Sequence, residues 1–162
     1  MSARTHAPAP GLDIATAIDA PPNRVFTAFF ELAALQAWWQ VSNAVTTPRL
    51  LGPYVVEWPP SEVRDDVLGR LGGVFRGTIV HIEPGHSFFV ADAYWLPPEG
   101  EPIGPMALEV VLTNSDLPSR GSTRVHVTQR GFDESVRWRR YYEVIQVGWD
   151  RALASLKGLL EH

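Results

Sequence analysis

Two carboxylates interrupt apolar segments of the sequence, and such carboxylates are candidates for acid–base chemistry. Glu57 lies in YVVEW and Asp92 lies in SFFVADAYW. Alternation along the second segment predicts one strand face formed by Phe88, Val90, Asp92 and Tyr94. If this face points inward, Asp92 lies in an apolar cavity and is a candidate acid or base. The competing interpretation places Asp92 near the strand end, where it is solvated or paired with an arginine.

A second pair of carboxylates, Asp65 and Asp66, lies among other charged residues. Glu62, Arg64 and Arg70 flank the pair in the segment PPSEVRDDVLGRLGG. Such a segment is typical of a solvated surface loop. We therefore assign no catalytic residue here, or elsewhere in the sequence.

The histidines show no metal-ligand spacing, and the sequence contains no cysteine, so no metal site is predicted. The sequence also lacks a Gly-x-Ser-x-Gly elbow, a phosphate-binding loop and a dinucleotide fingerprint, so no cofactor is predicted. The histidines are His6, His81, His86, His126 and His162.

The segment TRVHVTQRGF places two polar residues on opposite faces of a strand. His126 alternates with two valines that are the expected inward residues, so His126 should face solvent. The same alternation directs Gln129 inward. A buried glutamine often satisfies backbone groups, but beside Tyr142 it could orient the polar group of a ligand.

Charge and length exclude several classes of partner. The formal net charge of the 162 residues is −4 and the basic residues are scattered, so nucleic acid is not a predicted partner. No stretch approaches the ~20 apolar residues of a membrane span, and the absence of cysteine favours a cytoplasmic location. The cluster RWRR is interpreted as a surface network in which Arg139 pairs with Glu143, in preference to an anion site.

Hydrophobic periodicity predicts the elements that position these residues. LDIATAI predicts a strand, followed by a short helix whose first turn holds two prolines and whose cap is Asp19. ELAALQAWW predicts a second short helix with Leu32, Leu35 and Trp39 on one side. Residues 43–130 then read as an antiparallel meander with long loops at 59–73 and 96–105. Its strand segments are YVVEW, VFRGTIVHIEPG, SFFVADAYW, ALEVVLT and TRVHVTQRGF.

Residues 133–161 contain no proline and predict one long helix that begins at Asp133 and Glu134. At 1.5 Å per residue this helix is roughly 40 Å long, and the sheet is its only available partner. A curved sheet cannot contact one helix everywhere, so a gap is either filled by side chains or left as a cavity. The apolar stripe of the helix consists of Trp138, Tyr141, Tyr142, Ile145, Trp149, Ala152, Leu153, Leu156 and Leu160.

The stripe is aromatic at its start and rich in leucine at its end. We interpret the leucine end as packed core and the aromatic end as a cavity wall. The sequence holds 6 tryptophans, and clustered aromatic side chains are typical of sites for apolar ligands. The predicted lining residues are Trp38, Trp39, Tyr54, Trp58, Phe75, Val90, Asp92, Tyr94, Gln129, Trp138, Tyr141, Tyr142 and Ile145.

The order of these elements resembles the helix-grip fold of START-like (SRPBCC) proteins. IDAPPNRVFTAFFELAALQAWW is similar to the opening of that group, GTIVHIEPGHSFFVADAYW to its hairpin and GWDRALASLKGLLE to its closing segment. Together they resemble bacterial relatives of the C-terminal domain of the heat-shock-protein-90 ATPase activator, from about Leu12 to Leu160. The resemblance implies an α+β fold in which a curved antiparallel sheet wraps around a long C-terminal helix, with two short helices after the first strand.

Three functions are consistent with this resemblance. The first is binding of a small apolar or aromatic molecule between sheet and helix. The second is a cyclase or aromatase that uses the same cavity, with Asp92, Gln129 or a tyrosine as proton handler. The third is a chaperone cofactor or protein-interaction domain. We rank them in this order. A cyclase needs two titratable groups in the cavity and the sequence offers one plausible carboxylate, while an interaction domain needs an exposed apolar or charged patch that the sequence does not locate. We also expect a disordered tail (1–11), a single domain (12–162) and a monomer or weak homodimer.

Overall fold

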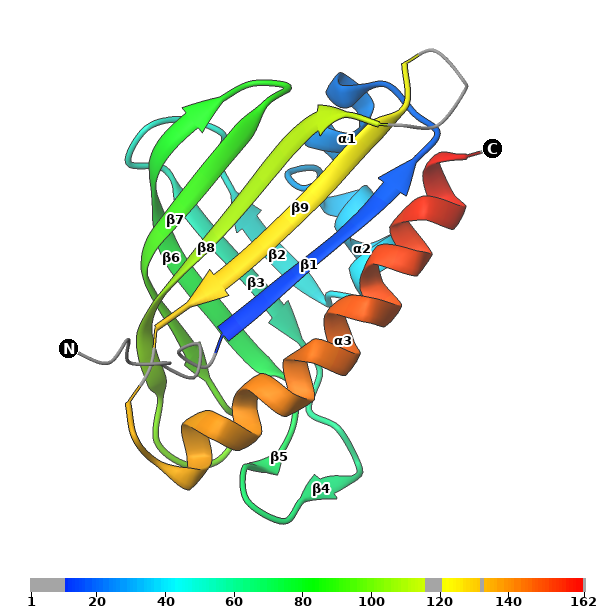
Figure 1. Ribbon diagram of the computed structural model, residues 1–162. Coiled ribbons are helices and arrows are strands. Elements are labelled where there is room, and N and C mark those ends of the chain that lie inside the picture. The colour runs from blue at the N-terminus through cyan, green and yellow to red at the C-terminus, as the bar shows by residue number, and fades with distance from the viewer. Residues whose placement is uncertain (1–10, 116–120, 132, 162) are drawn as a thin grey trace, which may run out of the picture.

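One curved antiparallel sheet forms most of the molecule, and a long helix runs along it (Figure 1). The computed structural model describes residues 11–115, 121–131 and 133–161. The strand order is β1-β9-β8-β7-β6-β3-β2, and the predicted α+β helix-grip fold is confirmed. The strands of the sheet are β1 (Gly11–Ile18), β2 (Asn43–Thr46), β3 (Pro53–Trp58), β6 (Gly73–Glu83), β7 (Ser87–Leu96), β8 (Ile103–Asn114) and β9 (Thr123–Arg130).

The predicted strand segments all form strands of this sheet, and three further strands were not predicted. The short edge strand β2 pairs with β3. Within the predicted loop 59–73, β4 (Arg64–Asp65) and β5 (Gly69–Arg70) form a small separate hairpin. Because β8 begins at Ile103, the predicted loop 96–105 is shorter than expected.

Two short helices follow β1, as predicted: α1 (Pro22–Ala28) and α2 (Leu32–Trp39). The prediction that Asp19 caps the first helix is wrong. Pro21 occupies the N-cap position, and no side chain caps this end. Proline suits this position because its missing N–H would have no partner inside the helix.

The buried side of α2 differs from the predicted side. Leu32 is 42% exposed, whereas Trp38 is 1% exposed. Leu35 and Trp38 are three residues apart, so they lie on the same side of the helix and are buried together. Trp39 is half-buried at the edge of this face.

The long helix α3 spans Val136–Leu160, which is 25 residues and about 38 Å. It begins later than predicted because Ser135, and not Asp133, is its cap. The Ser135 Oγ accepts a hydrogen bond from the backbone N–H of Trp138 at 3.2 Å. The predicted apolar stripe is confirmed, since all its members are buried except the half-buried Ile145.

Aromatic side chains fill the interior beside α1. The ring of Phe88 lies 4.9–6.0 Å from the rings of Phe26, Phe29, Phe30 and Tyr54. The Tyr54 hydroxyl donates to the carbonyl of Phe29 at 2.8 Å, and its burial raises the pKa of this phenol. The leucines near the end of α3 are buried in the same core, as predicted.

A bulge in β7 breaks the alternation on which the inward placement of Asp92 depended. The pairing of β7 with β8 shifts between Val90 and Ala93, and Asp92 adopts a φ of 51°. Beyond the bulge, Ala93 and Trp95 are buried, whereas Asp92 is exposed and Tyr94 is half-buried. The prediction that Asp92 lies inside the cavity is therefore wrong.

The predicted tail of residues 1–11 falls outside the described residues, except for Gly11, with which β1 begins. Within the described residues, no helix is long and apolar enough to cross a membrane.

Candidate ligand-binding site

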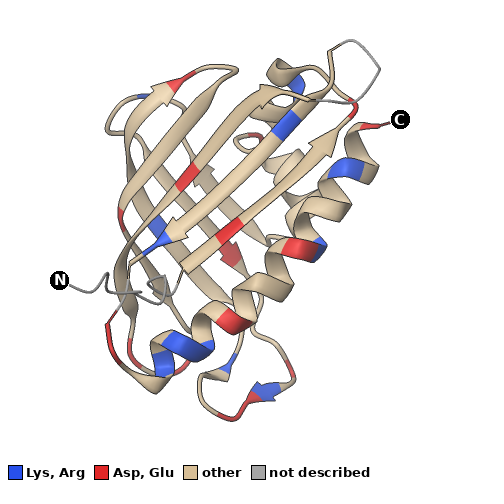
Figure 2. Ribbon diagram, in the orientation of Figure 1, with Lys and Arg blue, Asp and Glu red and all other residues tan. Residues whose placement is uncertain are grey.

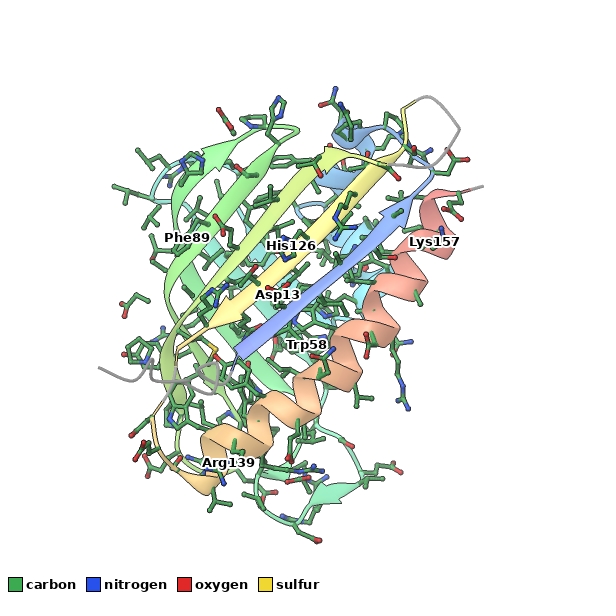
Figure 3. The ribbon with its side chains drawn as sticks, in the orientation of Figure 1. Asp13, Trp58, Phe89, His126, Arg139 and Lys157 are labelled. Atoms are coloured by element: carbon green, nitrogen blue, oxygen red, sulfur yellow. The ribbon has the colours of Figure 1, made fainter. Side chains whose placement is uncertain are left out.

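A cavity of about 570 Å³ lies between the inner face of the sheet, α2, α3 and the loop of residues 59–72. This volume is in the range of pockets that hold small molecules. Figure 3 labels Trp58, whose side chain reaches this region from the end of β3. The apolar lining residues are Trp38, Trp39, Trp58, Pro59, Leu68, Leu71, Phe75, Trp95, Leu108, Val144, Ile145, Trp149 and Ala152.

Tryptophan rings from three parts of the chain form one contiguous wall. Trp39 stacks on Trp38 with ring centroids 5.0 Å apart. The same ring meets Trp58 edge-on at 5.3 Å and Trp149 of α3 at 4.7 Å. Trp39 thus joins α2, β3 and α3 around the cavity.

Most indole N–H groups around the cavity are bonded to the protein itself, and among the described tryptophans of the lining only that of Trp39 is not. Trp38 donates to the carbonyl of Ala28 at 2.8 Å, and Trp58 donates to that of Trp39 at 2.9 Å. Trp95 donates to the carbonyl of Gly72 at 2.8 Å. These rings therefore present apolar surface to the cavity.

Gln129 lies at the inner end of β9 and is 3% exposed, as its alternation predicts. Its amide oxygen accepts from the Trp149 indole N–H at 3.2 Å. Its amide nitrogen donates to the Tyr141 hydroxyl at 2.9 Å and to the sulfur of Met106 at 3.0 Å. The tyrosine that Gln129 contacts is Tyr141, whereas the sequence interpretation placed Gln129 beside Tyr142.

Tyr142 instead fixes the chain between β9 and α3. Its hydroxyl donates to the carbonyl of Gly131 at 2.7 Å, and burial raises its pKa to about 12. Because Tyr141 and Tyr142 are adjacent on a helix, they diverge by about 100°. Tyr141 points to the cavity and Tyr142 to the connection.

The cavity opens between the end of α2 and the middle of α3. Gln40, Gly148, Arg151 and Ser155 line it there and are exposed. Arg151 is the one charged side chain among the described lining residues. Charge is thus confined to the mouth.

The loop of residues 59–72 closes one side of the cavity with Leu68 and Leu71. Asp65 organises this loop: its Oδ2 accepts from the backbone N–H groups of Val67 at 3.0 Å and Leu68 at 2.9 Å. Its Oδ1 accepts from Arg140 Nε at 2.8 Å. The hydrogen bond from Arg140 lowers the pKa of Asp65 from 3.8 to about 2. The prediction that Asp65 lies in a solvated loop is therefore wrong, since its side chain is only 6% exposed.

A second set of charges holds the same loop. Glu99, between β7 and β8, pairs with Arg64 and also with Arg70 at 3.2 Å.

The predicted ion pair between Arg139 and Glu143 on α3 is wrong. Arg140, and not Arg139, pairs with Glu143 at 3.1 Å. Arg140 lies on the side of α3 that faces the loop of residues 59–72, where it also pairs with Asp65. Figure 2 shows acidic and basic residues side by side along α3 and around the β4–β5 hairpin.

The structure brings seven of the predicted lining residues to the cavity and leaves six elsewhere. Tyr54 and Val90 belong to the packed core, and Asp92 and Tyr94 face away beyond the bulge. Trp138 and Tyr142 are buried where α3 begins, outside the cavity. The seven are Trp38, Trp39, Trp58, Phe75, Gln129, Tyr141 and Ile145.

Several lining residues were missed for identifiable reasons. Trp149 lies on the predicted stripe of α3, one helical turn beyond Ile145, and the helical period alone could have indicated it. Trp95 is inward because of the bulge, which the alternation does not reveal. Leu68 and Leu71 lie in a loop whose fold depends on Asp65, a contact between distant segments.

His126 lies on the outer face of the sheet, as predicted. Figure 3 shows it beside Asp13 on the neighbouring strand β1. The ring Nε2 is 2.6 Å from the Asp13 carboxylate. This pair is remote from the cavity.

Comparison with known structures supports the fold. Protein CV1439 from Chromobacterium violaceum is 20% identical, with a TM-score of 0.69 over 94% of this chain and 98% of that one. Protein Ms6760 from Mycobacterium smegmatis is 18% identical, with a TM-score of 0.68 over 93% and 90% of the two chains. The Aha1 dimer from Colwellia psychrerythraea is 17% identical, with a TM-score of 0.61 over 93% and 96%.

No functionally curated protein matches the sequence. The model of the family described as Activator of Hsp90 ATPase homolog 1-like protein matches residues 19–161. This match extends from the end of β1 to the end of α3, and so includes every element around the cavity. The chain belongs to the family of Activator of Hsp90 ATPase homolog 1-like proteins.

Proposed function

We propose that this chain binds a small apolar or aromatic molecule in the cavity between the sheet and α3. The observation that carries the proposal is the cavity of about 570 Å³, whose wall is formed largely by tryptophan and aliphatic side chains. Three of its indole N–H groups already bond to backbone carbonyls. An apolar ligand would remove this surface from water without leaving those groups unpaired.

The lining favours binding over the cyclase alternative. Among the described residues that line the cavity, none is Asp, Glu, His or Lys. Asp92 and Glu57, the carboxylates considered from the sequence, are both exposed. General acid–base catalysis requires positioned groups that exchange protons near neutral pH, and burial moves Tyr141 away from that range by raising its pKa.

Quenching of tryptophan fluorescence tests the proposal, because several indole rings line the cavity. The panel contains fatty acids, sterols and polycyclic aromatic compounds. We expect saturable quenching by at least one class, and loss of it in Leu71→Arg, which places a charge in the wall. Phe89→Arg, on the outer face of β7, is the matched control (Figure 3). Absence of saturable quenching across the panel would contradict the proposal.

A protein partner is the second candidate, and the family match supports it. The description of that family names activation of the Hsp90 ATPase. Stimulation of a purified Hsp90 ATPase by this chain, unchanged in Leu71→Arg, would favour this function over ligand binding. A cytoplasmic location and a monomer or weak homodimer remain predictions.

A further inference from the structure

The orientation of the Gln129 side-chain amide is determined by its neighbours. The Trp149 indole N–H can only donate, so the amide atom 3.2 Å from it is the oxygen. The amide nitrogen therefore faces the Tyr141 hydroxyl at 2.9 Å and the Met106 sulfur at 3.0 Å. Both amide hydrogens are used, one on each acceptor.

This arrangement makes the Tyr141 hydroxyl an acceptor toward Gln129, so its own hydrogen points elsewhere. Among the described residues, no protein group accepts that hydrogen. Tyr141 is 4% exposed and lines the cavity. Its ring is held by stacking on Trp95, with centroids 5.3 Å apart. The hydroxyl is protonated at neutral pH, since the ordinary tyrosine pKa of 10.0 already lies well above 7 and burial raises the pKa of Tyr141 further.

Most other donors of the cavity lining are already bonded, and the exception among the described tryptophans is the half-buried Trp39, whose indole N–H has no acceptor. The indole N–H groups of Trp38, Trp58 and Trp95 are bonded to backbone carbonyls. The polar side chains Gln40, Arg151 and Ser155 are exposed at the mouth. The Tyr141 hydroxyl is thus an oriented donor set in an apolar wall.

We propose that the ligand is an uncharged apolar or aromatic molecule with a hydrogen-bond acceptor, such as a ketone carbonyl, that accepts from Tyr141. This inference rests on the proposed binding function. A carboxylate in the same position would lose its hydration without gaining a charged partner, which is costly. A ligand whose only polar group is a hydrogen-bond donor would place that donor against the Tyr141 hydroxyl hydrogen, and both would stay without an acceptor.

Three tricyclic compounds of nearly the same shape test the proposal: fluorene, 9-fluorenone and carbazole. Fluorenone adds an acceptor and carbazole adds a donor. Equilibrium dialysis measures their affinities for the full chain. We expect fluorenone to bind about three- to tenfold more tightly than fluorene, as for one neutral hydrogen bond, and carbazole to gain nothing.

Tyr141→Phe removes the hydroxyl and retains the ring that stacks on Trp95. We expect this variant to bind fluorene as the wild type does and to lose the preference for fluorenone. Tyr142→Phe, the adjacent tyrosine outside the cavity, is the matched control and should keep the preference. The infrared carbonyl band of bound fluorenone should lie at lower frequency in the wild type than in Tyr141→Phe.

The outcomes separate this inference from the binding function. Equal affinity for fluorene and fluorenone in the wild type would overturn the inference while leaving the cavity as an apolar binding site. A preference that survives in Tyr141→Phe would also overturn it, because a donor other than the Tyr141 hydroxyl, such as the Trp39 indole N–H, would then account for the preference. Absence of binding by all three compounds would contradict both proposals.

Discussion

Val90 and Asp92 lie two residues apart on β7, yet Val90 is 0% exposed and Asp92 points into solvent. The bulge between Val90 and Ala93 separates them. It also turns Trp95 inward, where its indole N–H reaches the carbonyl of Gly72 at 2.8 Å. One irregular residue in β7 thus determines which side chains the strand supplies to the cavity.

The effect of substituting Asp92 on the free energy of unfolding should depend on its backbone conformation and not on its charge. At a φ of 51°, glycine is unstrained, so Asp92→Gly should leave the free energy of unfolding unchanged or raise it. Asp92→Val should lower it by about 1–2 kcal/mol, because a β-branched residue is disfavoured there. Urea denaturation measures both. Similar stabilities for the two variants would show that the bulge is not fixed by this residue.

Ile145→Ala and Leu156→Ala compare two members of one helical stripe. Leu156 is 0% exposed in the packed core, and its truncation should cost about 2–5 kcal/mol. Ile145 faces the cavity and is half-buried, so its truncation should cost less and should weaken ligand binding. Thermal denaturation and fluorescence quenching measure the two effects. A larger stability loss in Ile145→Ala would indicate that side chains close the cavity.

Substitution of Ser135 should destabilise the protein more than substitution of Asp133, the residue that the sequence predicted as the cap of α3. Ser135→Ala removes the acceptor 3.2 Å from the Trp138 N–H and should cost about 0.5–2 kcal/mol. Asp133→Ala, two residues earlier and exposed, should cost much less. The two variants are compared by urea denaturation. Equal losses would mean that both residues stabilise the start of α3.

Acid titration should reveal the contact between Asp65 and Arg140. Its folded pKa of about 2 lies below the ordinary 3.8, so it adds stability that is present above the ordinary value and lost as pH falls from about 4 to about 2. Asp65→Asn should remove this part of the pH dependence. Asp66→Asn, at the exposed neighbouring position, should retain it. Urea denaturation along a pH series measures the difference, and matching profiles for both variants would contradict the assignment.

The sequence predicts the parts of this fold that follow a regular period. The apolar stripe of α3 is regular over its whole length, so its buried residues could be identified before the structure. The inward direction of Gln129 also follows from regular alternation in β9. Both predictions depend only on residues within one element.

Features that depend on contacts between distant segments could not be predicted. Asp65 looks like any loop carboxylate until Arg140 is placed beside it, 75 residues later in the chain. Trp95 follows a bulge whose local sequence, VADA, contains no glycine, and a single aspartate between alanines does not by itself distinguish a bulge from a regular strand. Prediction of the cavity lining was accordingly better on α2 and α3 than on β7.

Among the described strands, β1 pairs with β9 alone, more than a hundred residues away in the sequence. Gly11 pairs with Arg130, and Ile18 pairs with Thr123. The free edge of β1 contacts the last turns of α3, where Lys157 donates to the carbonyl of Ala17 at 3.0 Å. During synthesis from the N-terminus, β1 therefore stays without its partners until β9 and α3 have emerged from the ribosome. The pairing of β1 with β9 is thus a contact of long sequence separation, and contacts of this kind slow folding because the chain between them must be ordered first.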